Sequence, residues 1–129
     1  MRVLMTGGTG FVGCHTVARL MKDGHEIRML VRSESRVSPA LTPLGVDPSQ
    51  VEVVLGDVTD RESIKGAIDG VDAIVHAASV YTMDKRRAKE IVATNKIGAE
   101  IVLSEAWNAG LDPIVYVSSI AAVLSPEKG

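Results

Sequence analysis

Residues 6–13 read TGGTGFVG, and this stretch limits the possible folds more than any other part of the chain. It stands between a short apolar run and a segment with helical periodicity, which predicts a strand, a turn and a helix in succession. Gly7 permits a tight turn that a Cβ would disfavour. Gly10 lets a pyrophosphate approach the main chain, and Gly13 lets the helix lie close to the sheet. The unpaired N–H groups at the helix start complete the pattern of a dinucleotide site. The alternative is a glycine turn that binds nothing.

Composition and charge narrow the class further. The 129 residues suit one domain, and 46% apolar but only 3% aromatic residues indicate an aliphatic core, typical of a parallel sheet covered by helices. The net charge of −2 gives no nucleic-acid surface. The single Cys14 is expected to be a packing residue and suits a reducing compartment, while His15, His25 and His76 lack metal-ligand spacing. No signal peptide or span of ~20 apolar residues is visible, so we expect a cytoplasmic protein without membrane partners.

The pattern of apolar runs and turn residues predicts strands alternating with helices. We expect strands at residues 2–6, 26–31, 51–55, 73–76 and 114–118, and helices at 11–23, 61–69 and 84–109. Residues 33–50 hold three prolines and are expected to form a loop with at most one short helix, near 36–42. Right-handed crossovers then give a doubly wound α/β fold of the Rossmann type, with a parallel sheet in strand order 3-2-1-4-5. Ligands should bind beyond the carboxyl ends of the strands.

The helical periodicity also predicts which side chains face the core and which residues cap the helices. Thr59 or Asp60 can cap the helix of residues 61–69, and Gly24 suits a left-handed position after the first helix. The residues at helical spacing are Phe11, Val12, Val17, Leu20 and Met21 in the first helix, and Ile91, Val92, Ile97, Ile101, Val102 and Leu103 in the long one.

Five motifs together carry a family resemblance that covers the whole chain. They are the glycine stretch 6–13, GDVTD at residues 56–60, HAA at 76–78, NKIG at 95–98 and VSS at 117–119. In this order they resemble the extended short-chain dehydrogenase/reductase family, the NAD(P)-dependent epimerase/dehydratase and dihydroflavonol-reductase-like group.

The resemblance implies a cofactor site. Gly7, Thr9, Gly10, Phe11, Val12 and Gly13 would surround the diphosphate, and Ala77, Ala78 and Ser79 would border the nicotinamide half. Asp57 would accept a hydrogen bond from the adenine amino group beside the Val58 backbone. Asp57 is also a candidate cap for the helix of residues 61–69, and the two roles can hold together. His76 is expected to be a packing residue at the strand end, not a base.

The end of the second strand bears on the choice of cofactor. An acidic side chain near this point accepts hydrogen bonds from the ribose hydroxyls of NAD, but by the family pattern the position is Val31, which cannot accept. Arg32 supplies a guanidinium suited to a 2′-phosphate, and Ser33 adds a hydroxyl. We therefore expect NADP in preference to NAD. Two alternatives stay open: Arg32 as a solvated strand-end residue, and Glu34 in the ribose role.

The catalytic candidates follow the fifth strand. By resemblance, Ser119 hydrogen-bonds the substrate carbonyl or alcohol during hydride transfer, or Ser118 does if the register shifts by one. The family's Tyr-x-x-x-Lys pair belongs on a helix after this serine, and the chain ends at Gly129. A Tyr-x-x-x-Lys sequence does occur at residues 81–85, but upstream of the serine, so we interpret it as coincidence. Asn95 is expected to pin backbone in the long helix and not to touch substrate, and the loop at residues 81–83 is expected to face the substrate.

These expectations combine into one functional interpretation. Residues 1–129 would be the N-terminal portion of an NAD(P)-binding Rossmann domain, truncated before the catalytic helix and the substrate region, and inactive alone. The parent would be an NADP-dependent oxidoreductase or nucleotide-sugar epimerase/dehydratase acting on a carbonyl or alcohol. An NADP-sensing regulatory protein of the same fold is the alternative, and a methyltransferase Rossmann domain fits less well. The fifth strand would leave an exposed sheet edge that favours a homodimer.

Overall fold

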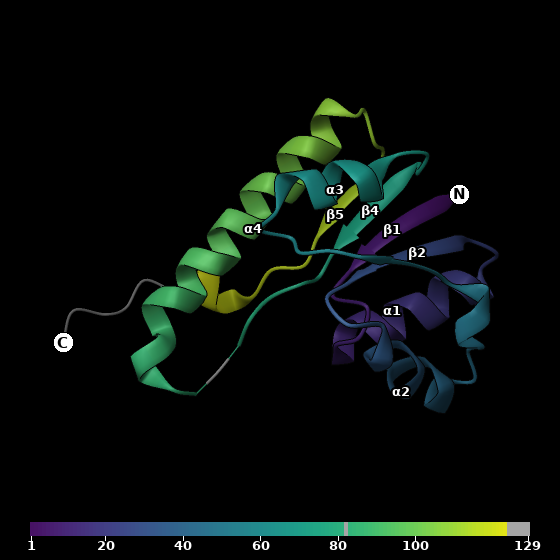
Figure 1. Cartoon of the computed structure of the whole chain (residues 1–129), viewed down its shortest axis with the longest axis horizontal. Helices are drawn as coiled ribbons and strands as arrows, with labels where there is room; N and C mark the ends of the chain where they lie inside the picture. Colours follow the sequence, from purple (N-terminus) through teal and green to yellow (C-terminus); the bar gives the residue numbers. More distant parts are fainter. Residues whose placement is uncertain (82, 124–129) are drawn as a thin grey trace.

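A single parallel sheet organises the protein (Figure 1). The computed structural model describes residues 1–81 and 83–123. Its five strands are β1 (Arg2–Thr6), β2 (Glu26–Val31), β3 (Glu52–Leu55), β4 (Ala73–His76) and β5 (Ile114–Tyr116), in the order β3-β2-β1-β4-β5. The predicted fold class and strand order are confirmed.

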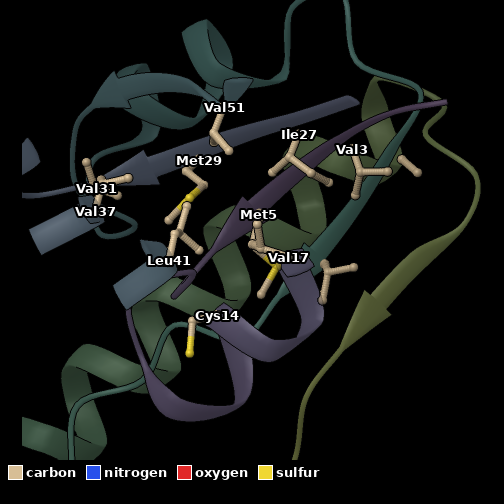
Figure 2. Close-up of a cluster of buried hydrophobic side chains, with 12 residues drawn as sticks. Val3, Met5, Cys14, Val17, Ile27, Met29, Val31, Val37, Leu41 and Val51 are labelled. Carbon is tan, nitrogen blue, oxygen red and sulfur yellow. The ribbon is translucent and has the colours of Figure 1, made fainter. Parts of the chain in front are cut away.

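Two helical layers cover the sheet, one on each face (Figure 1). Helices α1 (Phe11–Lys22) and α2 (Val37–Leu41) lie on one face, and α3 (Arg61–Ile68) and α4 (Ala88–Asn108) lie on the other. Figure 2 shows the first core, where side chains of β1 and β2 meet those of α1 and α2; Met29 and Leu41 lie at its centre and are fully buried. The second core joins Leu4 and Ile74 of the sheet to Ile64 and Val102 of the helices.

Several element boundaries differ from the prediction. The long helical pattern is divided into a 3₁₀ turn, η4 (Lys85–Arg87), and α4, and β5 ends at Tyr116, two residues early. The proline-containing loop holds the predicted short helix as α2, but also three 3₁₀ turns, which the pattern did not predict: η1 (Glu34–Arg36), η2 (Thr42–Leu44) and η3 (Pro48–Gln50). Residues 82 and 124–129, the latter expected to form a loop, lie outside the described part.

Four of the side chains expected on buried helix faces are exposed. Phe11 and Val12 lie in the first turn of α1, and their exposed fractions are 82% and 54%. Phe11 packs edge-to-face against the neighbouring His15 ring, with centroids 5.1 Å apart. Val92 and Ile97 are 67% and 46% exposed, and the buried residues of α4, Gly98, Val102 and Ala106, all lie from the middle of the helix onward.

Arg28 is a buried charge within the sheet, and its position explains how β2 is tied to α3. Its Nη1 donates to the carbonyl oxygens of Ala67 (2.7 Å) and Asp69 (2.5 Å) at the end of α3. Its Nε lies 2.9 Å from a carboxylate oxygen of Glu52 on β3. A cation is favourable at the C-terminus of a helix, where carbonyls lack intrahelical partners. Arg28 therefore joins α3, β2 and β3 through polar contacts.

Candidate functional site

The turn after β1 is too tight for any side chain. Gly7 has a φ of +73°, and a Cβ there would lie 2.5 Å from backbone atoms of Ala77 and Ala78. A Cβ on Gly13 would lie 2.0 Å from the Gly7 carbonyl oxygen. Both distances are far below van der Waals contact. The backbone at the end of β1 therefore packs directly against the backbone at the start of α1 and against the segment after β4. Gly7 and Gly10, which have no side chains, also line the cavity described below, so the turn presents bare main chain to it.

The first turn of α1 has no protein cap. Gly10 makes no side-chain cap hydrogen bond, and the turn contains no acidic residue. The helix hydrogen bonds begin with the Cys14 N–H, which donates to the Gly10 carbonyl at 2.9 Å. By contrast, Asp60 caps α3 through its side chain. Helix N-termini left open in this way have free N–H donors and a partial positive charge, the features that bind phosphates.

A cavity of about 260 Å³ opens at the carboxyl ends of the strands, next to this turn. Its lining includes nine of the cofactor residues expected from the sequence: Gly7, Thr9, Gly10, Arg32, Asp57, Val58, Ala77, Ala78 and Ser79. Phe11, Val12, Gly13, Ser33, Ser118 and Ser119 are not in the lining. Eight further residues complete the lining. Val31, Gly56, Asn95 and Gly98 belong to positions or motifs that the sequence analysis named, whereas Leu30, Arg36, Val80 and Thr94 were missed.

Two arginines stand at the end of the cavity formed by β2 and the following turn. Arg32 and Arg36 are both exposed, and within the described residues neither takes part in an ion pair. Arg36 comes to the cavity because η1 folds the chain back within four residues of Arg32. The sequence does show a second arginine four residues after Arg32, but it lies in a segment that we expected to be mainly loop. Ser33 is paired with the Ser35 hydroxyl (2.8 Å), and Glu34 is outside the lining.

Asp57 is held in a turn facing the cavity. Its Oδ1 accepts hydrogen bonds from the Thr59 N–H (2.9 Å) and the Thr59 hydroxyl (2.8 Å). The Thr59 N–H lowers the pKa of Asp57 below its ordinary value, and the nearby charge of Arg32 adds to this effect. The alternative role of Asp57, capping α3, is wrong because Asp60 accepts from the Glu62 N–H at 3.2 Å. Asp57 therefore presents an ionised carboxylate at the cavity.

Helix α4 forms the opposite wall through two residues of the NKIG motif. The Asn95 side chain accepts from the Val80 N–H (2.8 Å) and donates to the Val80 carbonyl (3.0 Å). It therefore pins the backbone of the loop after β4, a different segment from its own helix. A Cβ on Gly98 would lie 3.0 Å from the Val58 side chain, so this glycine allows α4 to approach the cavity floor. Asn95 therefore shapes the site through a backbone contact, and Gly98 does so by leaving room for the Val58 side chain.

The serine candidates lie outside the cavity, on the segment after β5. Ser118 and Ser119 are exposed, and the Ser119 hydroxyl oxygen accepts from the Ala121 N–H at 3.2 Å, capping the 3₁₀ turn η5 (Ile120–Ala122). In the expected substrate-facing loop, Tyr81 donates from its hydroxyl to the Met83 sulfur (3.0 Å), while Thr82 is outside the described residues.

Neither a metal site nor a membrane span occurs in the described part of the chain. Residues 1–81 and 83–123 contain no group of three or more metal-ligating side chains. No helix there is long and apolar enough to cross a membrane.

The parallel sheet order, the glycine turn and the cavity at the strand ends define an α/β protein of the Rossmann type. Residues 4–129 match the 3-beta hydroxysteroid dehydrogenase/isomerase family, and the chain belongs to this family. The expected resemblance to extended short-chain dehydrogenases/reductases is thereby confirmed.

Three relatives illustrate the similarity. A 3 beta-hydroxysteroid dehydrogenase/Delta 5→4-isomerase of Mycobacterium tuberculosis is 36% identical over 95% of this chain and 33% of its own length. A short-chain dehydrogenase/reductase superfamily protein of Agrobacterium tumefaciens, solved with bound NAD, is 28% identical, with a TM-score of 0.73 over 92% of this chain and 33% of that one. A UDP-glucose-4-epimerase of Stenotrophomonas maltophila, solved with NAD, has a TM-score of 0.81 at 23% identity, over 98% and 39% of the two chains, and supports the fold alone. The chain spans about a third of the length of the curated relatives it matches.

Proposed function

We propose that the cavity binds NADP and that the chain is the cofactor-binding portion of an oxidoreductase. One observation carries this proposal: the glycine turn at an uncapped helix start lines the same cavity as two arginines that form no ion pair within residues 1–81 and 83–123. The bare backbone suits a diphosphate, and the arginines suit a second phosphate at the far end of the ligand. NADP carries both groups.

The residues fit a dinucleotide in an extended pose. The free backbone amides of Phe11, Val12 and Gly13 would donate to the diphosphate. These residues can therefore bind the cofactor although they are not among the residues that line the cavity. Asp57 would accept from the adenine amino group, with Val58 beside it. Ala77, Ala78 and Ser79 would border the nicotinamide half, where larger side chains would narrow the passage.

The two arginines favour NADP over NAD. Val31 occupies the position where an acidic residue would accept from the ribose hydroxyls, and Arg32 follows it with Arg36 nearby. A hydrogen bond to a charged group contributes about 1.5–3 kcal/mol, which corresponds to about ten- to a hundredfold in affinity. NAD lacks the 2′-phosphate and would gain none of this.

We propose hydride transfer at a carbonyl or alcohol as the chemistry of the parent protein. A bound nicotinamide supplies or accepts the hydride. Ser119 already accepts a hydrogen bond from the Ala121 N–H, so its hydroxyl proton is free to donate to a substrate oxygen. Ser118 is the alternative donor. The name of the Mycobacterium relative and the family match support hydroxysteroids as the substrate class, and nucleotide sugars are the alternative.

The proposal is tested by measuring NADPH and NADH affinities of the chain by calorimetry. We expect tighter binding of NADPH, and about a tenfold or greater loss of NADPH affinity in Arg32→Ala with NADH unchanged. Arg19→Ala is the matched control, because Arg19 is an exposed arginine on α1 outside this cavity. Unchanged NADPH affinity in Arg32→Ala would refute the proposed selectivity, and no binding of either nucleotide would refute the cofactor site.

We also propose that the chain forms a homodimer through β5. In the described residues β5 pairs with β4 alone and lies at the end of the sheet. Val115 and Tyr116 are 43% and 48% exposed. An exposed strand edge offers unpaired backbone groups to another chain.

A further inference from the structure

We infer that Thr6 and His76 are a pair of positioning residues that hold the Ala78 backbone in place at the cavity wall, with Thr6 donating to a neutral His76. The inference deepens the proposed function, because the segment that the pair would position is the one assigned to the nicotinamide half of the cofactor. Neither side chain lines the cavity, so both would act through the backbone.

The pair lies where β1 and β4 end side by side. Thr6 and His76 are register partners in the sheet, and their exposed fractions are 0% and 1%. The Thr6 Oγ1 lies 2.6 Å from the His76 Nδ1 and accepts a hydrogen bond from the Ala78 N–H at 3.3 Å. One buried hydroxyl therefore contacts both the histidine ring and the backbone of the cavity wall.

Hydrogen-bond accounting assigns the proton between the two side chains. The Ala78 N–H can only donate, so the Thr6 oxygen is an acceptor in that contact. Among the described residues the His76 Nδ1 is the one acceptor recorded for the Thr6 hydroxyl proton. A buried hydroxyl without an acceptor is unfavourable. Thr6 therefore donates to an unprotonated Nδ1, and the ring carries its proton on Nε2. Burial, which lowers the pKa of His76 to about 4, keeps this ring neutral.

Contacts on the other side of the ring fix His76 itself. Its ring stacks on Tyr116 of β5, with centroids 5.4 Å apart and planes 14° from parallel. Its carbonyl accepts from the Val117 N–H at 2.9 Å. Contacts with β1 and β5 therefore fix the position of the His76 ring. Its hydrogen bond with Thr6 in turn fixes the hydroxyl that contacts the Ala78 N–H.

The Ala78 backbone must be held in place because it packs very closely against the glycine turn. A Cβ built on Gly7 would lie only 2.5 Å from backbone atoms of Ala77 and Ala78. On the far side, Asn95 pins Val80. The segment 78–80 is therefore held at each end by one side chain, Thr6 and Asn95. Loss of the Thr6 hydroxyl would let the segment 78–80 shift relative to the glycine turn.

Three variants separate positioning from simple packing. Thr6→Val keeps the shape but removes the hydroxyl, Thr6→Ser keeps the hydroxyl, and His76→Phe keeps the stacked ring but removes the acceptor. We expect Thr6→Val and His76→Phe to bind NADPH about tenfold more weakly, while Thr6→Ser retains the affinity of the natural chain. Binding of 2′,5′-ADP, which lacks the nicotinamide half, should change little in all three.

Two measurements on the free chain test the pair without any nucleotide. Nitrogen NMR should show His76 with a bare, hydrogen-bonded Nδ1 and a protonated Nε2, and Thr6→Val should shift the Nδ1 signal and speed exchange of the Ala78 amide. A proton on Nδ1 in the natural chain would overturn the inference, as would full NADPH affinity in Thr6→Val. If the natural chain binds neither nucleotide, the proposed function fails, whereas the NMR results still decide the hydrogen-bond pair.

Discussion

At the scale of single residues, His76 is a buried base whose ionisation opposes folding. Burial lowers its pKa from 6.5 to about 4. Between these values the unfolded chain binds more protons than the folded chain, so the free energy of unfolding rises with pH over this window and is flat above it. The full effect is of the order of 3 kcal/mol, at about 1.4 kcal/mol per pKa unit.

This gives a testable pH dependence. Denaturant unfolding of the natural chain between pH 4 and 7 should show stability falling as the pH is lowered from about 6.5. His76→Phe should remove most of that slope, because the titrating group is gone. His15→Gln, at an exposed histidine, should retain it. Equal slopes in the natural chain and His76→Phe would show that other groups cause the acid sensitivity.

The sequence predicted some site residues better than others, for physical reasons. Gly7 was predictable because its turn conformation and the backbone packed against it exclude a side chain. Arg32 was predictable from its place at a strand end. Arg36 was not, because its approach depends on a 3₁₀ turn in a segment without periodicity. His76 was correctly expected to pack, but its bond to Thr6 depends on the β1–β4 register, which no local pattern reveals.

At the scale of elements, two glycines within helices have opposite roles. A Cβ on Gly13 in α1 would lie 2.0 Å from the Gly7 carbonyl oxygen, whereas a Cβ on Gly66 in α3 would meet nothing within 4 Å. Gly13→Ala should therefore destabilise the chain by at least about 2 kcal/mol through overpacking. Gly66→Ala should stabilise it by about 0.5–1 kcal/mol, since glycine disfavours a helix interior.

Chemical denaturation of the two variants tests this difference. The same substitution in two helices provides its own control for helix propensity. A Gly13→Ala chain as stable as the natural one would mean that α1 does not approach the turn after β1 as closely as described. Gly13→Ala should also abolish NADPH binding in a folded chain, because α1 would be displaced from its place beside the turn.

The type of an element was predictable where its hydrophobic pattern is unambiguous. The apolar runs of β1, β2 and β4 gave their bounds correctly, since these strands are buried on both faces of the sheet. The end of β5 was not predictable, because the strand is partly exposed and its apolar run continues past the last paired residue. The exposure of Val92 on α4 was missed because the N-terminal half of that helix has the same apolar spacing as the rest, although the buried residues begin only at Gly98.

At the scale of the whole molecule, the sheet edge at β5 decides the expected state of association. Sedimentation should show a monomer–dimer equilibrium that shifts with concentration, if β5 pairs with a second copy. Val115→Lys places a charge on the exposed strand and should favour the monomer, whereas Leu55→Lys, on the opposite edge strand β3, should leave the equilibrium unchanged. A monomer at every concentration would contradict pairing through β5.

The central claim is that a dinucleotide lies with its diphosphate against the bare backbone between β1 and α1. A crystal structure of the chain grown with saturating NADP tests it most directly. We expect the diphosphate beside residues 7–13 and the 2′-phosphate within hydrogen-bond distance of Arg32. A crevice closed by the protein's own side chains, with the nucleotide absent or bound elsewhere, would contradict the account.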